Sequence, residues 1–70
     1  MMPIAVQSSD LAAVDYDRWR GTLTIEFHSG GVYEYYNVPF SEYIGLMNAG
    51  SHGRYFHANI KDCYSSRRIQ

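Results

Sequence analysis

The clearest hydrophobic pattern lies between Leu23 and Tyr35, where apolar and polar residues alternate. Side chains of an extended chain point alternately to opposite faces, so this segment presents one hydrophobic and one polar face. The hydrophobic face comprises Leu23, Ile25 and Phe27 before a glycine-containing turn, and Tyr33 and Tyr35 after it. The turn, Ser29-Gly30-Gly31, suits a hairpin because glycine accepts positive φ angles. We therefore predict an antiparallel β-hairpin that buries its hydrophobic face.

Two shorter extended segments precede the hairpin, Ile4–Gln7 and Leu11–Tyr16. Between them, Ser8-Ser9-Asp10 is typical of a turn, because these side chains bond to nearby backbone groups. Strict alternation in the second segment would place Ala12, Val14 and Tyr16 on one face, and Leu11 and Ala13 on the other. Short connections make neighbouring strands antiparallel, so we expect a meander of three to four strands.

Two amphipathic helices are predicted in the C-terminal half, after Val38-Pro39. The first has apolar residues at the i, i+3, i+4 and i+7 positions of one helical face, namely Phe40, Tyr43, Ile44 and Met47. The second begins at the N-cap residue Ser51, and its apolar positions are Phe56, Ile60, Cys63 and Tyr64. Residues 65–70 lack this periodicity and form either a frayed tail or a short edge strand fixed by Ile69.

These elements predict an α+β fold in which a small antiparallel β-meander packs against two C-terminal helices. A chain of 70 residues forms one domain, here residues 1–70. A domain this small buries only about 60% of its unfolded surface, and the aromatic fraction of 16% supplies large side chains for the core. The single cysteine, Cys63, excludes an internal disulfide. We expect it to be an inert thiol in the core.

The sequence also bears on the location of the protein. It contains neither a secretory signal pattern nor an apolar run of the roughly 20 residues needed to cross a bilayer. We therefore expect a cytoplasmic protein in a reducing setting, with no membrane partner.

The net charge of −1 is unevenly distributed along the chain. The first 50 residues carry two arginines against six acidic residues, a net charge of −4, whereas the last 20 carry four basic residues against one acidic residue, a net charge of +3. Four cations make a modest phosphate-binding surface. Two of them, Arg54 and Lys61, would lie on one side of the second helix because they are seven residues apart.

Motifs along nearly the whole chain, from about Val6 to Ile69, are similar to those of the KTSC domain family. The most specific are Tyr33-x-Tyr35, Ser51-x-Gly53-x-Tyr55-Phe56 and Ile60-Lys61. The family is named for its occurrence at the C-terminus of some lysyl-tRNA synthetases, and it also occurs as stand-alone bacterial or phage proteins. The resemblance implies a shared fold and a module without an established activity, for which RNA binding is proposed from the synthetase context. One residue departs from the family pattern: His57 stands where the family usually has Asn, which alters any site that uses the Asn.

Our first functional hypothesis is a non-catalytic module that binds RNA or another single-stranded nucleic acid through a C-terminal basic face. The candidate residues are the cations Arg54, Lys61, Arg67 and Arg68, with Tyr36 and Tyr55 as surfaces for base stacking. Free amide hydrogens at the start of the second helix favour an anion at Ser51, His52 and Gly53. The competing interpretation is ordinary solvated charge, because cations near the end of a helix stabilise its dipole without a ligand.

Tyr33 and Tyr35 have two interpretations. Tyrosines that alternate along a strand form stacking platforms in some single-strand binders. However, these two share the hydrophobic face of the hairpin, which favours a place in the core. In that case Tyr36 and the exposed parts of Tyr16 and Tyr55 are the better stacking candidates.

The alternative hypothesis is a protein-interaction or self-association module that uses an exposed sheet edge or the loop around Trp19. This loop, Asp17–Gly21, connects the second strand to the hairpin. Folding of the indole back onto the sheet is favoured, because it removes a large apolar surface from water. An exposed Trp19 would instead be a contact residue for a partner.

The sequence offers no catalytic constellation, so we do not expect an enzyme. Asp15 and Asp17 lie beside arginines and are typical of solvated ion pairs, and neither a G-x-S-x-G elbow nor a phosphate-binding glycine loop is present. We also expect no metal and no other cofactor. On a helix, His57 and Cys63 would lie about 240° apart, and His52 and His57 about 140° apart, too far around to share one ion.

Overall fold

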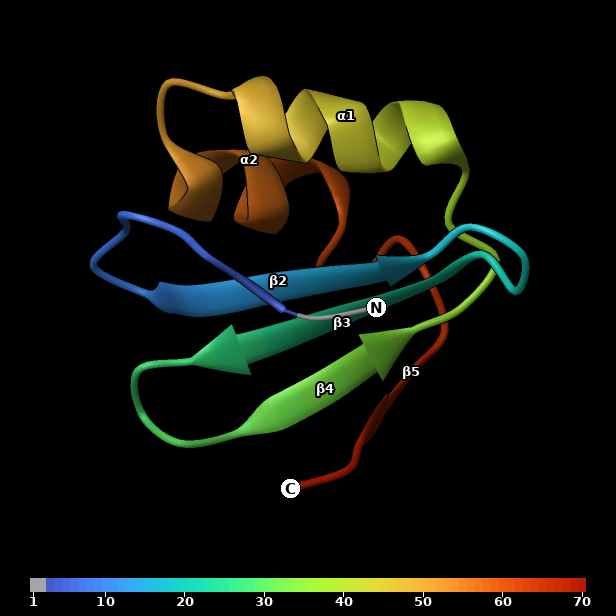
Figure 1. Cartoon of the computed structure of the whole chain (residues 1–70), viewed down its shortest axis with the longest axis horizontal. Coiled ribbons are helices and arrows are strands. Elements are labelled where there is room, and N and C mark those ends of the chain that lie inside the picture. Colours follow the sequence, from blue (N-terminus) through green and yellow to red (C-terminus); the bar gives the residue numbers. More distant parts are fainter. Residues whose placement is uncertain (1–2) are drawn as a thin grey trace.

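The computed structural model describes residues 3–70, which form a five-stranded antiparallel sheet with two helices on one face (Figure 1). The strands are β1 (Ile4–Ala5), β2 (Leu11–Asp17), β3 (Thr22–Phe27), β4 (Val32–Tyr35) and β5 (Ser66–Arg68), and they lie side by side in this order. The helices are α1 (Phe40–Asn48) and α2 (His52–Asn59). The predicted α+β fold, an antiparallel sheet with two helices, is confirmed. No helix formed by residues 3–70 is long and apolar enough to cross a membrane.

The sheet has one strand more than the predicted three to four, because the C-terminal segment adds β5. This strand pairs with β4, with Arg68 opposite Tyr33 and Arg67 opposite Glu34. The backbone N–H of Ile69 donates to the carbonyl of Val32 at 2.8 Å, so the edge-strand interpretation of the segment is confirmed. The two helices consequently lie between β4 and β5 along the chain rather than at its end.

The core lies between the helices and the sheet face that they cover. Its fully buried side chains are Leu11, Val14, Leu23, Ile25, Val38, Leu46, Phe56 and Ile60. Tyr16 and Tyr35 are buried members of the same cluster, and Phe27 and Tyr33 pack against it with part of their surface exposed. The predicted hydrophobic face of the hairpin is therefore confirmed.

Strand β2 departs from simple alternation at its start. Leu11 pairs with Phe27 whereas Ala13 pairs with Glu26, so the register shifts by one residue between them. This bulge turns Leu11 to the same face as Val14, and both are buried. The expectation that Leu11 lies on the opposite face was wrong for this reason.

The buried face of α1 is also rotated relative to the prediction. Leu46 is its fully buried residue, and Tyr43 and Met47 pack beside it, whereas Phe40 and Ile44 are 39% and 41% exposed. A close approach between the helices accounts for the rotation. A Cβ atom added to Gly45 would lie only 2.8 Å from Cζ of Tyr55 in α2, so the glycine must face α2 and the neighbouring Ile44 turns outwards.

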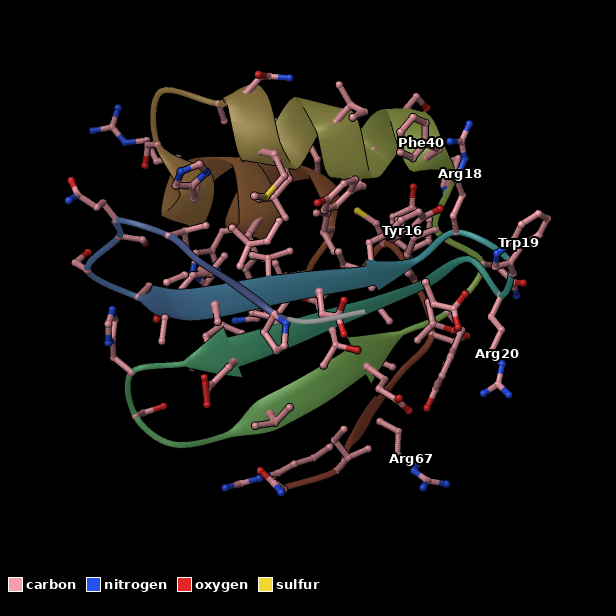
Figure 2. All side chains as sticks on the ribbon, viewed as in Figure 1. Tyr16, Arg18, Trp19, Arg20, Phe40 and Arg67 are labelled. Carbon is pink, nitrogen blue, oxygen red and sulfur yellow. The ribbon has the colours of Figure 1, made fainter. Side chains whose placement is uncertain are left out.

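The indole of Trp19 does not fold back onto the sheet, which contradicts the prediction. It is 97% exposed and projects from the turn between β2 and β3 (Figure 2). The carboxylate Oδ1 of Asp17 accepts hydrogen bonds from the backbone N–H groups of Trp19 and Arg20, at 3.0 and 3.2 Å. These bonds fix a turn that directs the indole outwards. The nearby end of the core is already closed by Tyr16, whose ring stacks on Tyr43 at 4.8 Å between centroids.

Cys63 is exposed rather than buried, so the expected core thiol is also wrong. The helix α2 ends at Asn59, and Asp62 adopts a positive φ of 65°. Helical spacing therefore does not extend to Cys63. Phe56 and Ile60 are buried as predicted, because they lie within the helix and at its C-cap.

A buried hydrogen bond links β2 to the start of α1 and leads to a first prediction. The hydroxyl of Tyr16 donates to the backbone carbonyl of Val38 at 2.6 Å. Tyr16→Phe leaves this buried carbonyl without a donor, so we expect the free energy of unfolding to fall by about 1–2 kcal/mol. Urea denaturation followed by circular dichroism measures the change. Tyr36→Phe is the control and should cost under about 0.5 kcal/mol, since its hydroxyl bonds the side chain of Glu34 at the surface; equal losses would contradict the assignment.

A second prediction concerns alkaline pH. Burial raises the pKa of Tyr35 to about 12 and also raises the pKa of Tyr16 above its ordinary value of 10.0. The folded state therefore favours the neutral phenols, and the resulting stability is present below pH 10 and lost as pH rises towards 12. We expect the free energy of unfolding to decrease over this interval, and less steeply for Tyr35→Phe. Urea denaturation at a series of pH values tests this; identical slopes for the two proteins would refute it.

Candidate functional site

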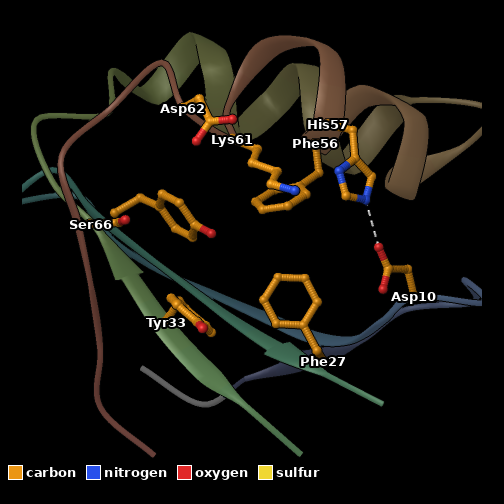
Figure 3. A pocket seen from close by; sticks show the side chains of 9 residues that line it. Asp10, Phe27, Tyr33, Phe56, His57, Lys61, Asp62 and Ser66 are labelled. Atoms are coloured by element: carbon orange, nitrogen blue, oxygen red, sulfur yellow. Dashed lines mark hydrogen bonds and ion pairs between the residues drawn. The ribbon is translucent and has the colours of Figure 1, made fainter. Parts of the chain in front are cut away.

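A pocket of about 330 Å³ opens between α2 and the helix-covered face of the sheet (Figure 3). Its lining residues are Asp10, Phe27, Tyr33, Tyr35, Phe56, His57, Lys61, Asp62 and Ser66. Ligand pockets in proteins have volumes of about 300–1,000 Å³, so this one suits a single small group. We call it the aromatic pocket.

Four aromatic rings form its floor. Phe27 meets Tyr33 and Phe56 edge-to-face, with centroids 5.8 and 5.4 Å apart. Tyr35 meets Phe56 edge-to-face at 5.4 Å and stacks on Tyr33 at 6.5 Å. Such ring pairs hold one another in place beyond the effect of burial alone. The floor is therefore a rigid apolar surface, with Tyr33 and Phe27 partly open to the pocket.

The burial of Tyr35 shows that the floor is dry at its deep end. Burial is the main reason that the pKa of Tyr35 is raised to about 12, and the neighbouring Tyr33 and Asp62 raise it further. At neutral pH the Tyr35 hydroxyl is therefore a neutral hydrogen-bond donor and acceptor inside an apolar surrounding.

The sheet edge beside the pocket carries a cation, Arg68, close to Gly31 and Tyr33. A Cβ atom at Gly31 would lie 3.3 Å from the ring of Tyr33 and 3.7 Å from a guanidinium nitrogen of Arg68. Without that atom, the guanidinium of Arg68 lies 5.9 Å from the centroid of the Tyr33 ring. The Nε of Arg68 also donates to the carbonyl of Gln70 at 2.9 Å, which fixes its position.

A second cation enters from the segment that follows α2. The helix ends at Asn59, and the turn through Asp62 brings Lys61, Asp62 and Ser66 to the pocket wall. None of the ion pairs found within residues 3–70 involves Lys61. The Lys61 side chain is exposed beside Asp62 at the pocket wall.

The opposite wall is formed by a paired histidine and aspartate. His57 Nε2 lies 2.7 Å from Oδ2 of Asp10, and this bond joins α2 to the turn between β1 and β2. Both side chains are about half exposed. His57 is the residue that departs from the family pattern, so the departure falls in the wall of the pocket.

The structure brings together two of the six residues proposed for nucleic-acid binding, Lys61 and Arg68, on either side of the aromatic floor. It does not assemble the predicted single basic face. Arg67 projects from β5 away from the helices (Figure 2), and Arg54 is exposed in the first turn of α2.

Of the three proposed stacking tyrosines, Tyr16 is buried and has no exposed part to offer a base, and the other two are engaged elsewhere. Tyr36 donates a hydrogen bond to Glu34 at 2.9 Å and lines a groove on the sheet face opposite the helices. Tyr55 packs against the core and against Gly45 of α1. Burial and the nearby carboxylate of Glu42 raise the pKa of its hydroxyl.

The proposed anion site at the start of α2 is partly satisfied by the protein itself. Ser51 Oγ accepts from the backbone N–H of Arg54 at 3.2 Å, which confirms Ser51 as the N-cap. The ring Nδ1 of His52 lies 2.9 Å from the carbonyl of Leu46, and Gly53 lies close to Ser8. Anion binding here stays a prediction.

The remaining histidine, His28, bonds the carbonyl of Ser8 through Nε2 at 2.9 Å. The described residues contain no group of three histidine, cysteine, aspartate or glutamate side chains that could hold a metal ion.

Sequence reasoning missed the pocket as a whole. Tyr33 and Tyr35 were assigned to the core, and they do belong to it, but their outer surfaces also line the pocket. The signal that could have indicated the pocket is the set of family motifs. Tyr33, Tyr35, Phe56 and Lys61 all occur in those motifs, and all four line the pocket.

Comparison with known proteins identifies the family in which these motifs occur. The family model of the KTSC domain matches residues 7–64. The chain is 46% identical over 63 residues to a lysine–tRNA ligase of Nostoc sp., which covers 90% of this chain and 11% of the ligase. It is 39% identical over 61 residues to an uncharacterized protein of Stutzerimonas stutzeri, covering 87% and 86% of the two chains.

A solved structure shows the same fold. The crystal structure of the KTSC domain protein YPO2434 from Yersinia pestis superimposes with a TM-score of 0.96, is 33% identical, and covers 99% of this chain and 97% of that one. The chain thus spans about a tenth of its ligase relatives but nearly all of the small proteins that it matches. Matching motifs, a matching family model and a matching structure lead to one conclusion: this chain belongs to the KTSC domain family.

Proposed function

We propose that this domain is a non-catalytic module that binds single-stranded RNA, with one base in the aromatic pocket and the adjoining phosphates on Lys61 and Arg68. The observation that carries the proposal is the placement of two cations on either side of a partly open aromatic floor. Aromatic rings that stack bases, next to cations that follow the backbone, are the usual means of binding single strands.

The polar groups of the pocket suit the edges of a base. Ser66, Asp62 and the hydroxyl of Tyr33 surround the floor, and each can donate to or accept from ring nitrogens and exocyclic groups. A base stacked on Tyr33 would contribute about 1–3 kcal/mol to binding. This combination favours a base over a purely aliphatic ligand.

Electrostatics favour an approach from the helix side. The open face of the sheet, opposite the helices, carries a cross-strand row of Asp15, Thr24, Glu34 and Arg67, with Glu26 beside it, so the carboxylates outnumber the cation three to one. These carboxylates repel phosphate. The ligase relatives supply the biological reason for choosing RNA, since they act on tRNA by name and contain a segment similar to this chain.

The polar groups of the pocket do not form a catalytic set. His57 and Asp10 are paired, but Ser66 lies on the other side of the pocket (Figure 3), and no hydrogen bond joins Ser66 to His57 within residues 3–70. A hydroxyl nucleophile needs a base within hydrogen-bond reach. Binding without reaction is therefore the function that the pocket supports best.

The cations provide the first test. Fluorescence anisotropy with a labelled single-stranded RNA measures affinity at several salt concentrations. Lys61→Ala combined with Arg68→Ala should weaken binding about tenfold and reduce the salt slope by about 1.4, the value for two lost phosphate contacts. The matched control, Arg54→Ala with Arg67→Ala, removes the same charge elsewhere and should bind as the wild type does. Equal losses in both pairs, or no binding by the wild type, would refute the proposal.

The aromatic floor provides the second test of the proposed function. Tyr33→Leu keeps an apolar residue but removes the stacking ring, so we expect RNA affinity to fall by about 5- to 100-fold. Tyr36→Leu, on the opposite face, should leave affinity unchanged. Amide NMR spectra with added nucleoside monophosphate should shift at residues around the pocket. Shifts confined to the open sheet face would argue against this site.

A further inference from the structure

The turn between β2 and β3 presents an unusual surface, which we call the Trp19 turn (residues 17–21). Trp19 is almost fully exposed, and an arginine stands on each side of it in the chain. The guanidinium of Arg18 lies over the ring of Phe40, 4.1 Å from its centroid. Arg20 lies 3.9 Å from Asp17 in an exposed ion pair. Tryptophan and arginine are the residues most often found at the energetic centres of protein interfaces.

The exposure of Trp19 is built into the backbone. Two backbone N–H groups of the turn donate to Asp17, and Gly21 closes it with a φ of 65°. The carbonyl of Gly21 accepts from the N–H of Val38 at 2.9 Å, which ties the turn to the body of the domain. The backbone of the turn is therefore fixed with the indole pointing into solvent, and a partner has to order only the Trp19 side chain.

The open face of the sheet contains a hollow whose apolar base and carboxylates complement the indole and arginines of the Trp19 turn. We call it the acidic hollow. It has a volume of about 180 Å³ and is lined by Pro3, Ala13, Asp15, Thr24, Glu26, Val32 and Gln70. Pro3, Ala13 and Val32 give it an apolar base, Asp15 and Glu26 supply carboxylates, and the described lining includes no basic residue.

One carboxylate of this hollow lacks a donor. The Oδ1 atom of Asp15 is buried and has no hydrogen-bond partner within residues 3–70. A buried acceptor without a donor is costly, and each such case in a native protein requires an explanation. Because this atom has almost no exposed surface, an indole N–H or a guanidinium from outside the chain reaches it only when the Asp15 side chain turns outwards.

We infer that these two surfaces bind each other between two copies of this chain: the Trp19 turn of one copy docks in the acidic hollow of a second. The apolar base accepts the indole, and Arg18 and Arg20 meet Asp15 and Glu26. Both halves of the contact are present on one chain, with opposite charge. This juxtaposition selects a second copy as the occupant.

The positions of the two surfaces allow a closed dimer. The Trp19 turn follows the end of β2, whereas the hollow lies over the middle of β2 and β3 and shares Asp15 and Thr24 with the groove beside the turn. Two copies placed face to face, with their strands running in opposite directions, bring each turn over the hollow of the other. Such a contact is isologous and closes at two subunits.

Other occupants fit the turn less well. The groove beside Trp19 on the open face is lined by three acidic residues, Asp15, Asp17 and Glu34, and by two basic ones, Arg18 and Arg20. Its net charge of −1 gives a phosphate chain or an anionic membrane no net attraction. The domain measures only 27 × 25 × 24 Å, so the contact is small and the dimer is of the weak, concentration-dependent class. The aromatic pocket lies on the opposite side of the sheet and stays free in the dimer.

Sedimentation velocity of the whole chain, from about 10 μM to 1 mM at low salt, tests the inference. The wild type should shift from monomer to dimer, and added salt should weaken the dimer. Trp19→Ala should raise the dissociation constant about thirtyfold. Arg54→Glu, which changes charge on α2 away from both surfaces, should dimerise as the wild type does. Circular dichroism of each variant verifies folding.

A charge exchange tests which surfaces meet. Arg20→Glu reverses the charge of the turn and Glu26→Lys that of the hollow, so each variant alone should be monomeric over the same range. Mixed together they should form a heterodimer, because the two reversed surfaces attract and the two native surfaces still match. A monomeric wild type, an unchanged Trp19→Ala dimer, or no association in the mixture would each overturn the inference. RNA binding by the aromatic pocket is measured separately and does not depend on the result.

Discussion

The position of one ring, that of Phe56, determines much of this structure. It projects from α2 onto the sheet and meets Phe27 and Tyr35 edge-to-face, each at 5.4 Å between centroids. Because the ring is fully buried between them, its size sets the distance that separates α2 from β3 and β4. The strands extend further than the helix does, and the uncovered part of their aromatic surface becomes the floor of the pocket (Figure 3). The same contact thus stabilises the core and creates a cavity beside it.

Two short helices can cover only one face of a five-stranded sheet, and the two faces of the sheet therefore carry different kinds of side chain. The covered face joins apolar strand residues to a pocket with Lys61 and Arg68 at its margin. The open face carries carboxylates along neighbouring strands, as expected for a sheet with one side in water. The pocket cations and the carboxylate-rich surface therefore lie on opposite sides of a domain only about 25 Å across.

The sequence predicted the hairpin, both helices and the family, because each depends on local periodicity or on adjacent motif residues. It failed where a specific contact, in most cases a non-local one, decided the outcome. Leu11 changed face because of a bulge against β3, and Ile44 turned outwards because Tyr55 occupies the space beside Gly45. Trp19 was expected to be buried on the basis of its apolar area, but hydrogen bonds to Asp17 determine its direction. The pocket could not be foreseen, since it combines residues from four separate segments, and the scattered cations could be placed only once β5 was known to join the sheet edge.

The segment from Ile60 to Arg68 leads from the helices back to the sheet edge and supplies Lys61, Asp62 and Ser66 to the pocket and Arg68 to its margin. Most of its side chains after Ile60 are exposed, and its backbone is held by pairing with a single strand. Ile60 and Tyr64 anchor the segment to the core, but the residues of β5 are exposed, so β5 can detach in a local fluctuation while the core stays folded. A ligand held by both cations, as proposed above, would bind only the attached state. Its affinity would therefore include the free energy of reattachment, and substitutions in β5 that never touch the ligand would alter binding through the population of that state.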